Sequence, residues 1–190
     1  MAPRDSGELC ASCLAEPPPF ATMRAAVAYG DIARTIALRL KYGGRIGLAR
    51  LIAQTMARHM TGLDDALIVP VPLHRARIWR RGYNQAALIA RALAGADSER
   101  LCLHALERTR ATPYLRGMGA SARAKAVRGV FVVPKEQRAA IKNRRILLVD
   151  DVYTSGATTR ACAKALRRHG AREVHVRCWA RVSRGEADAY

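Results

Sequence analysis

The residues most able to do chemistry are two neighbouring aspartates and the small hydroxyl-bearing residues that follow them. Asp150 and Asp151 come directly after the apolar run 146–149, and the stretch 154–158 follows two residues later. A short apolar run of this kind predicts a strand buried on both faces, with the two acids at its carboxyl end. Ligands of open α/β sheets bind at that end, and the N-terminus of a following helix favours a phosphate. Two carboxylates beside a phosphate cradle suit a ligand that carries a sugar diol and a phosphate.

For the acids alone, a simpler interpretation stays open: a surface turn with two solvated aspartates and a Ser/Thr helix cap. The whole string favours the ligand site. It resembles the ribose-5-phosphate-binding motif of type I phosphoribosyltransferases, in which four apolar residues and two acids precede a Thr/Ser-Gly-Ala-Thr loop. The resemblance implies an α/β, type I phosphoribosyltransferase-like fold with a mostly parallel central sheet flanked by helices. It assigns Asp150 and Asp151 to the ribose hydroxyls of phosphoribosyl pyrophosphate. The 5′-phosphate would be held by Thr154, Ser155, Gly156, Ala157 and Thr158.

A second informative stretch, 66–85, begins as a buried strand and then becomes strongly basic. Pro70 and Pro72 cannot donate ladder hydrogen bonds, so strand pairing must end near them. A rigid turn that presents several arginines after a strand suits pyrophosphate capture, because guanidinium groups match phosphate oxygens. A solvated basic loop is the alternative for this stretch alone. The residues predicted on the pyrophosphate side are Arg75, Arg77, Arg80, Arg81, Asn84 and Gln85.

Three strings narrow the resemblance to one family. Leu40-Lys41-Tyr42-Gly43, Val69-Pro-Val-Pro-Leu73 and Arg80-Arg81-Gly82-Tyr83-Asn84-Gln85 resemble the ComF family of phosphoribosyltransferase-like proteins, which is associated with bacterial competence and DNA uptake. The resemblance implies a phosphoribosyltransferase-like domain over 22–190, preceded by a short N-terminal segment, 1–21. Members of the family usually carry a four-cysteine zinc knuckle there, of which only Cys10 and Cys13 match. Zinc is therefore a weak, partial prediction.

The basic segment 107–129 resembles the flexible catalytic loop of type I phosphoribosyltransferases, which closes over the substrate and neutralises the leaving pyrophosphate. Arg108, Arg110 and Arg123 are its candidate ligand contacts. The segment departs from the family pattern twice: it reads Pro-Tyr-Leu-Arg at 113–116, and Val127 stands near an expected asparagine. No residue is therefore assigned as catalytic. A mobile, solvated linker is the alternative.

Composition restricts the class of protein and its partners. The net charge of +18 favours polyanions such as nucleic acid, although abundant arginine and alanine also suggest a GC-rich genome. Aromatic residues make up 5%, so no stacking platform for single strands is visible. The five cysteines do not form a disulfide framework, no apolar run approaches the ~18 residues that cross a bilayer, and no signal segment opens the sequence. A cytoplasmic protein without membrane insertion is expected.

The hydrophobic pattern elsewhere predicts alternating strands and helices. Asp31 is expected to cap one helix, Asn84 or a neighbour is expected to cap a second, and Leu51 is expected on the buried face of a third. The predicted strands are 25–29, 101–107, 130–133 and 173–182, and the predicted helices are 32–41, 45–60, 85–93, a turn within 135–143, and 157–169.

Two main functions follow. The first is a Mg²⁺-dependent phosphoribosyltransferase, in which Mg²⁺ binds mainly through the substrate's pyrophosphate and diol. The second is a non-catalytic competence protein that uses the same fold to bind a phosphoribosyl or nucleotide ligand, or single-stranded DNA, beside the competence machinery. A weaker third is a regulator that senses phosphoribosyl pyrophosphate.

Overall fold

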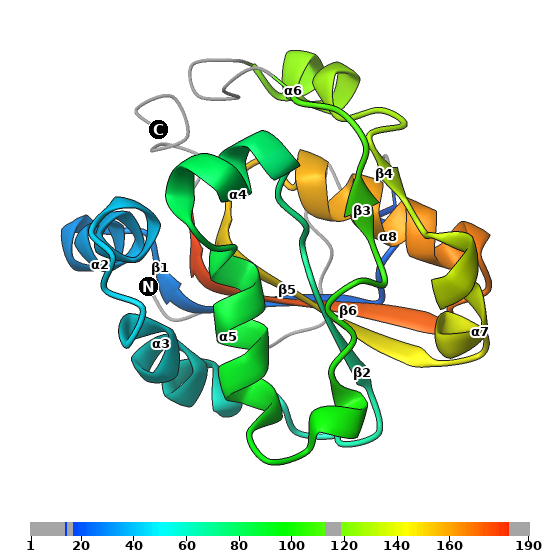
Figure 1. Cartoon of the computed structure of the whole chain (residues 1–190), viewed down its shortest axis with the longest axis horizontal. Helices are drawn as coiled ribbons and strands as arrows, with labels where there is room; N and C mark the ends of the chain where they lie inside the picture. Colours follow the sequence, from blue (N-terminus) through cyan, green and yellow to red (C-terminus); the bar gives the residue numbers. More distant parts are fainter. Residues whose placement is uncertain (1–13, 15–16, 113–118, 183–190) are drawn as a thin grey trace.

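A four-stranded parallel sheet forms the centre of the computed structural model, which describes residues 14, 17–112 and 119–182 (Figure 1). The strand order is β1 (Thr22–Ala28), β6 (Glu173–Arg181), β5 (Arg145–Tyr153) and β2 (Leu67–Pro70). All three neighbouring pairs run parallel. The predicted α/β class with a mostly parallel central sheet is therefore confirmed.

Helices cover both faces of the sheet and form a core on each. The helices α2 (Asp31–Tyr42), α3 (Leu48–Ala57) and α5 (Gln85–Ala94) pack on one face, and α8 (Ala157–Arg168) packs on the other (Figure 1). Strand β5 supplies alternate residues to the two cores: Ile146 and Leu148 to the α8 side, Leu147 and Val149 to the α2–α3–α5 side. This two-sided burial explains why the run 146–149 contains only apolar residues.

A small second sheet extends the α8 side. Strands β3 (Glu107–Arg108) and β4 (Phe131–Val132) pair antiparallel, and Phe131 joins the α8-side core. The helix α6 (Ala120–Ala126) precedes β4, and the short helices η2 (Lys135–Gln137) and α7 (Arg138–Ile141) lead into β5. These last two confirm the predicted helical turn in the connector before β5.

The structure corrects several predicted element boundaries. Strand β1 starts at Thr22 instead of 25, because Thr22 still pairs with His175 of β6. Asp31 is the first residue of α2, and the cap position belongs to Gly30, which makes no side-chain cap bond. Helix α3 covers only 48–57, and Leu51 is 46% exposed because Ile52 and its neighbours fill the core instead.

The predicted strand 101–107 is wrong. Leu101 forms an isolated bridge to Ile68 of β2, the chain then turns, and only Glu107, at the other end of the range, belongs to a strand, β3. Ala105 and Leu106 are buried in this turn, so their apolar character reflects core packing and not strand pairing. The basic stretch after β2, predicted as a rigid turn, instead forms the helix α4 (Arg75–Arg81). A short helix, η1 (Ser98–Arg100), follows α5.

None of the helices in the described part of the chain is long and apolar enough to cross a membrane.

Candidate functional site

Strand β5 carries both acids within its last four residues. The sequence predicted the acids just beyond the strand, but β6 continues to pair with β5 as far as Tyr153. Short local bonds fix the two carboxylates: Asp150 Oδ1 accepts a bond of 2.9 Å from the Asp151 amide, and Asp151 Oδ1 accepts one of 2.8 Å from the Val152 amide. The acids therefore project from a rigid, paired strand rather than from a turn.

Asp150 lies in surroundings that favour its protonated form. Burial raises the pKa of its carboxyl far above the usual range, and repulsion from Asp151 adds to the increase, while Lys41 opposes it. Burial raises the pKa of the Cys162 thiol, on α8, and the negative charge of Asp150 adds to the increase. Strongly perturbed carboxyl groups of this kind are typical of functional sites.

Asp151 forms an ion pair with a residue that the sequence did not assign to the site. The Lys41 ammonium, at the end of α2, lies 2.9 Å from Asp151 Oδ2, and both side chains are largely buried. From the sequence, Lys41-Tyr42-Gly43 could reach a ligand, but an ordinary helix end explains this string equally well. Its separation from Asp151 in the sequence gave no sign of the contact.

The loop 154–158 forms the predicted strand-to-helix turn. Gly156 adopts φ 76° at the N-cap of α8, and no side chain caps the helix there. The Thr159 hydroxyl donates to the Gly156 carbonyl at 3.0 Å. A cavity of about 30 Å³ is enclosed by Asp150, Val152 and the residues 153–159. The uncapped amides and surrounding hydroxyls are the groups that an anion would bind.

The predicted pyrophosphate residues fall into two groups. Arg81, Asn84 and Gln85 hold the corner between α4 and α5: Arg81 donates to Gln85 Oε1 at 2.9 Å, and Asn84 both caps α5 at the Ala86 amide and donates to the Val71 carbonyl. The predicted Asn84 cap is thus confirmed. Arg75 and Arg80 are exposed on α4, and Arg77 is partly buried.

Arg77 and Arg108 link α4 to the small sheet. Arg77 donates to the Thr112 carbonyl at 2.9 Å, and Arg108 donates to the Thr112 hydroxyl. Burial and repulsion from Arg77 lower the pKa of Arg108, whereas Asp150 raises it. The charge of Asp150 thus acts on Arg108, one of the predicted loop contacts. Residues 113–118, with the Pro-Tyr-Leu-Arg departure, lie outside the described residues.

The other two predicted loop contacts differ in exposure. Arg110 is exposed and donates to the Arg128 carbonyl at 2.7 Å. Arg123 is 6% exposed within α6. The bond to Arg128 gives Arg110 a structural role within the segment.

Metal ligands are limited in the described part of the chain. No group of three or more His, Cys, Asp or Glu side chains gathers there, and Cys10 and Cys13 lie outside it. The two carboxylates are hard oxygen donors that suit Mg²⁺, which usually completes its shell with water and substrate oxygens. The donor set thus fits Mg²⁺ that arrives with a phosphate ligand.

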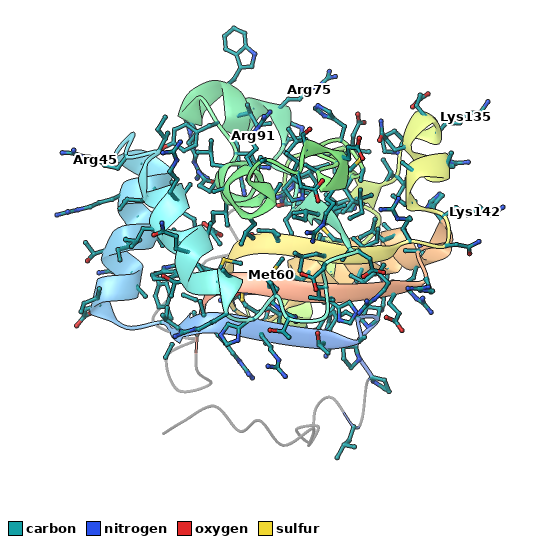
Figure 2. All side chains as sticks on the ribbon, turned by 90° about the horizontal axis from the view of Figure 1, so that it is seen from below. Arg45, Met60, Arg75, Arg91, Lys135 and Lys142 are labelled. Atoms are coloured by element: carbon teal, nitrogen blue, oxygen red, sulfur yellow. The ribbon has the colours of Figure 1, made fainter. Side chains whose placement is uncertain are left out.

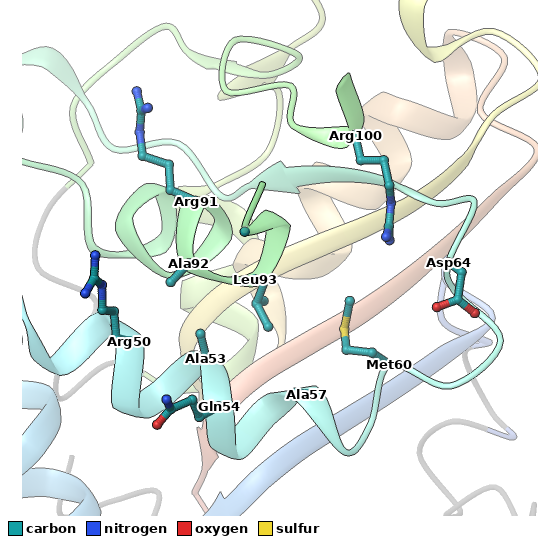
Figure 3. Close-up of a pocket in the computed structure, with 11 residues that line it drawn as sticks. Arg50, Ala53, Gln54, Ala57, Met60, Asp64, Arg91, Ala92, Leu93 and Arg100 are labelled. Atoms are coloured by element: carbon teal, nitrogen blue, oxygen red, sulfur yellow. The ribbon is translucent and has the colours of Figure 1, made fainter. Parts of the chain in front are cut away.

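A larger cavity of about 630 Å³ lies between α3 and α5 (Figure 3). Alanines, Leu93 and Met60 form its apolar surface, and Arg50, Arg91 and Asp64 lie around it. It shares no lining residue with the cavity at Asp150. Arg100 at its edge is already bound to the Leu63 and Ala66 carbonyls. Among its described lining residues, Asp64 is the only acid, so paired-carboxylate chemistry belongs to the β5 end.

Comparison with known proteins gives matches over most of the chain. A family model described as the phosphoribosyl transferase domain matches residues 80–189. The DNA utilization protein YhgH of Escherichia coli strain K12 is 31% identical over 180 residues, which cover 91% of this chain and 78% of that protein. Competence protein F of Haemophilus influenzae is 31% identical over 175 residues, 88% of this chain and 76% of its own.

One solved structure is a more distant likeness. The glutamine phosphoribosylpyrophosphate amidotransferase from B. subtilis, complexed with ADP and GMP, is 21% identical with a TM-score of 0.49, covering 75% of this chain and 30% of that chain. The domain match over 80–189 includes the Asp150 to Thr158 string and the described part of the basic segment before it.

Proposed function

Because the chain belongs to the ComF family of phosphoribosyltransferase-domain proteins, we propose that it binds phosphoribosyl pyrophosphate, or a related nucleotide, together with Mg²⁺. The observation that carries the proposal is the pair Asp150 and Asp151 at the end of β5, directly beside the uncapped N-terminus of α8. The names of the relatives refer to DNA utilization and competence, so we assign this chain to the uptake or processing of DNA.

Each part of the ligand has a chemical partner in this arrangement. Asp150 and Asp151 accept hydrogen bonds from the two ribose hydroxyls, and the loop 154–158 donates to the 5′-phosphate. The pyrophosphate faces α4, where Arg75, Arg77 and Arg80 supply positive charge. Mg²⁺ neutralises the pyrophosphate and makes it a better leaving group when it is bound with the ligand.

The transfer reaction open to this site is a displacement at the anomeric carbon. A ring nitrogen of an acceptor base forms the new bond to that carbon as the bond to the pyrophosphate oxygen breaks, and the base proton passes to solvent. No protein nucleophile is needed. A screen of nucleobases for pyrophosphate release separates an enzyme from a binding protein: release with one base supports transfer, and no release with any base supports binding alone.

Calorimetry with phosphoribosyl pyrophosphate and Mg²⁺ tests the binding site. We expect saturable heats with the wild type and none with the double variant Asp150→Asn/Asp151→Asn. The chain offers a matched control in its second adjacent acid pair, Asp64 and Asp65, both exposed. The variant Asp64→Asn/Asp65→Asn should bind as the wild type does. Equal heats from both double variants would refute the site assignment.

Single-stranded DNA binding is a second candidate function, favoured by one surface feature. Trp79 on α4 is 91% exposed, and none of the residues of this helix is buried. Arg75 and Arg80 on the same helix are also exposed, and Figure 2 shows Arg75 pointing into solvent. An aromatic ring among arginines is the usual surface on which bases stack, a feature that the low aromatic content of the sequence had concealed.

Binding of a fluorescent oligothymidylate across a salt series tests this candidate. Trp79→Ala should weaken binding by about tenfold, because one stacked base contributes roughly 1–3 kcal/mol, and should leave the salt dependence unchanged. Ile32→Ala, which removes another exposed apolar side chain on α2, is the control. No binding at low salt would exclude the DNA function, and an unaltered affinity in Trp79→Ala would exclude stacking.

A further inference from the structure

The Asp151 carboxylate is covered in the free chain. Asp151 is 9% exposed, and its Oδ1 is occupied by the Val152 amide. Its Oδ2 is fully buried; Lys41 lies 2.9 Å away, and no hydrogen bond from another described residue reaches that oxygen. A ribose hydroxyl can therefore bind Oδ2 only if the Lys41 ammonium moves aside.

The end of α2 also contacts the α4–α5 corner, which the proposed function places on the pyrophosphate side. The guanidinium of Arg81 stacks 4.9 Å from the ring centroid of Tyr42 and donates to its hydroxyl at 3.3 Å. The Tyr83 hydroxyl donates to the Leu40 carbonyl at 2.6 Å. The residues on both sides of Lys41 are thus fixed to the α4–α5 corner, while the flexible stem of Lys41 reaches to the ribose side.

We propose that Lys41 couples the two halves of the ligand site, covering Asp151 until a pyrophosphate attracts its ammonium. This inference rests on the proposed function, since it assumes that the ribose and the pyrophosphate bind where that function assigns them. An ammonium group has three donors on a flexible four-carbon stem, so it can exchange one anion for another without movement of the backbone. The anion at the α4–α5 corner would then uncover Asp151 for the diol.

The proposed role of Lys41 predicts that the two halves of the ligand strengthen each other's binding, which is the opposite of what repulsion between anions alone would give. Pyrophosphate and ribose 5-phosphate are both anions, so two such fragments in one site should weaken each other's binding. If pyrophosphate withdraws Lys41 from Asp151, each fragment should instead strengthen the binding of the other, by the same factor in both directions. A Mg²⁺ ion shared by the two fragments would also couple them, so the diagnostic result is positive coupling that is lost when Lys41 is replaced.

The experiment titrates ribose 5-phosphate calorimetrically, with and without saturating magnesium pyrophosphate. In the wild type we expect affinity for ribose 5-phosphate to rise about tenfold when magnesium pyrophosphate is present, within the range typical of coupled sites. In Lys41→Met the coupling factor should fall to one or below. A role of Lys41 in folding alone would weaken both fragments equally and leave the factor unchanged.

Lys135→Met serves as the matched control, because Lys135 is exposed on η2 at the opposite end of the molecule from α2 (Figure 2). It should keep the wild-type factor. A wild type without positive coupling, although both fragments bind, would overturn the inference even if Lys41→Met failed to fold. If neither fragment nor phosphoribosyl pyrophosphate binds the wild type, the proposed function itself fails, which is a separate outcome.

Discussion

At the scale of single residues, the Asp150 carboxyl of the candidate site lowers the stability of the folded chain when it is ionised. Its carboxyl is held between Asp151 and buried neighbours, and burial first, then Asp151, raises its pKa. A folded-state pKa above the unfolded value means that the folded chain retains a proton which the unfolded chain loses. The free energy of unfolding therefore falls as pH rises from about 4, the ordinary carboxyl pKa, toward the raised value.

Replacing this carboxyl should stabilise the free protein at the same time as it removes ligand binding. At pH 7.5 we expect Asp150→Asn to raise the free energy of unfolding by roughly 1–3 kcal/mol, because the amide is never charged. Near pH 4 the variant and the wild type should be about equally stable. Urea unfolding at the two pH values measures the difference, with the exposed Asp64→Asn as control. A variant less stable than the wild type at pH 7.5 would contradict the assigned pKa direction.

Gly156 is required by both its backbone and its neighbour. Its φ of 76° is rare for other residues, and a Cβ there would lie 2.2 Å from the Tyr153 hydroxyl. We expect Gly156→Ala to lower the free energy of unfolding by about 1–2 kcal/mol from backbone strain, and to weaken phosphate-ligand binding as Tyr153 shifts. Thermal unfolding and calorimetry measure both effects.

Gly30→Ala is the comparison, since Gly30 has an extended backbone and open space around it. It should change stability by no more than about 0.5 kcal/mol. Adding Tyr153→Ala to Gly156→Ala should recover only the part due to the contact with Tyr153. Full recovery would show that backbone strain contributes nothing.

At the scale of elements, helix α4 presents its arginines and Trp79 without burying any residue of its own. Its two ends and the bond from Arg77 to the Thr112 carbonyl hold it in place instead. The His74 side chain accepts a bond from the Ala76 amide, and Gly82 ends the helix with φ 83° and a bond of 2.7 Å to the Ile78 carbonyl. Asn84 then starts α5 and ties it to Val71 after β2. The caps and this tie therefore position the basic corner.

Asn84 should accordingly be important for both stability and ligand affinity. We expect Asn84→Ala to cost about 1–2 kcal/mol in unfolding free energy, from loss of the helix cap and of the bond to Val71. Asn84→Asp keeps an acceptor for the cap and loses only the donor to Val71, so its loss should be smaller. Urea unfolding of both variants measures the two losses of unfolding free energy. Equal losses would mean that the cap contributes little.

At the scale of the whole molecule, the net charge of +18 acts on both ligands and fold. A field of this sign accelerates the encounter with anions, and it also repels the chain from itself in the compact state. Salt screens such repulsion beyond about 10 Å at 0.1 M. The same charge that suits polyanions should therefore make the folded state sensitive to ionic strength.

Thermal unfolding between 20 and 300 mM NaCl tests this consequence. The Tm should rise with salt, by roughly 2–4 °C for each kcal/mol of repulsion that is screened in a domain of this size. Arg34→Glu and Arg138→Glu lower the charge at exposed positions on α2 and α7, and together they should reduce the slope. A Tm that falls with salt would show that attractive ion pairs dominate instead.

Local patterns allowed the main elements to be predicted where burial and periodicity agreed. The run 146–149 and the loop after it gave β5 and α8, and the Asn84 cap was predicted as observed. Prediction failed where an apolar residue had another role. Leu51 is exposed on α3, and Ala105 and Leu106 fill the core from a turn. An amphipathic pattern does not reveal which of several apolar side chains the neighbouring elements will cover.

The sequence by itself determined the kind of site: an apolar run, two acids, a glycine and hydroxyls at fixed offsets define a strand, a turn and a helix start. These are local relations, and chain geometry enforces them wherever the segment is placed. Only the tertiary structure decided that Lys41 covers Asp151, that Arg77 and Arg108 both bind Thr112, and that burial raises the pKa of Asp150. Ion pairing and desolvation depend on which distant segments pack against the strand end, and no spacing along the chain encodes that.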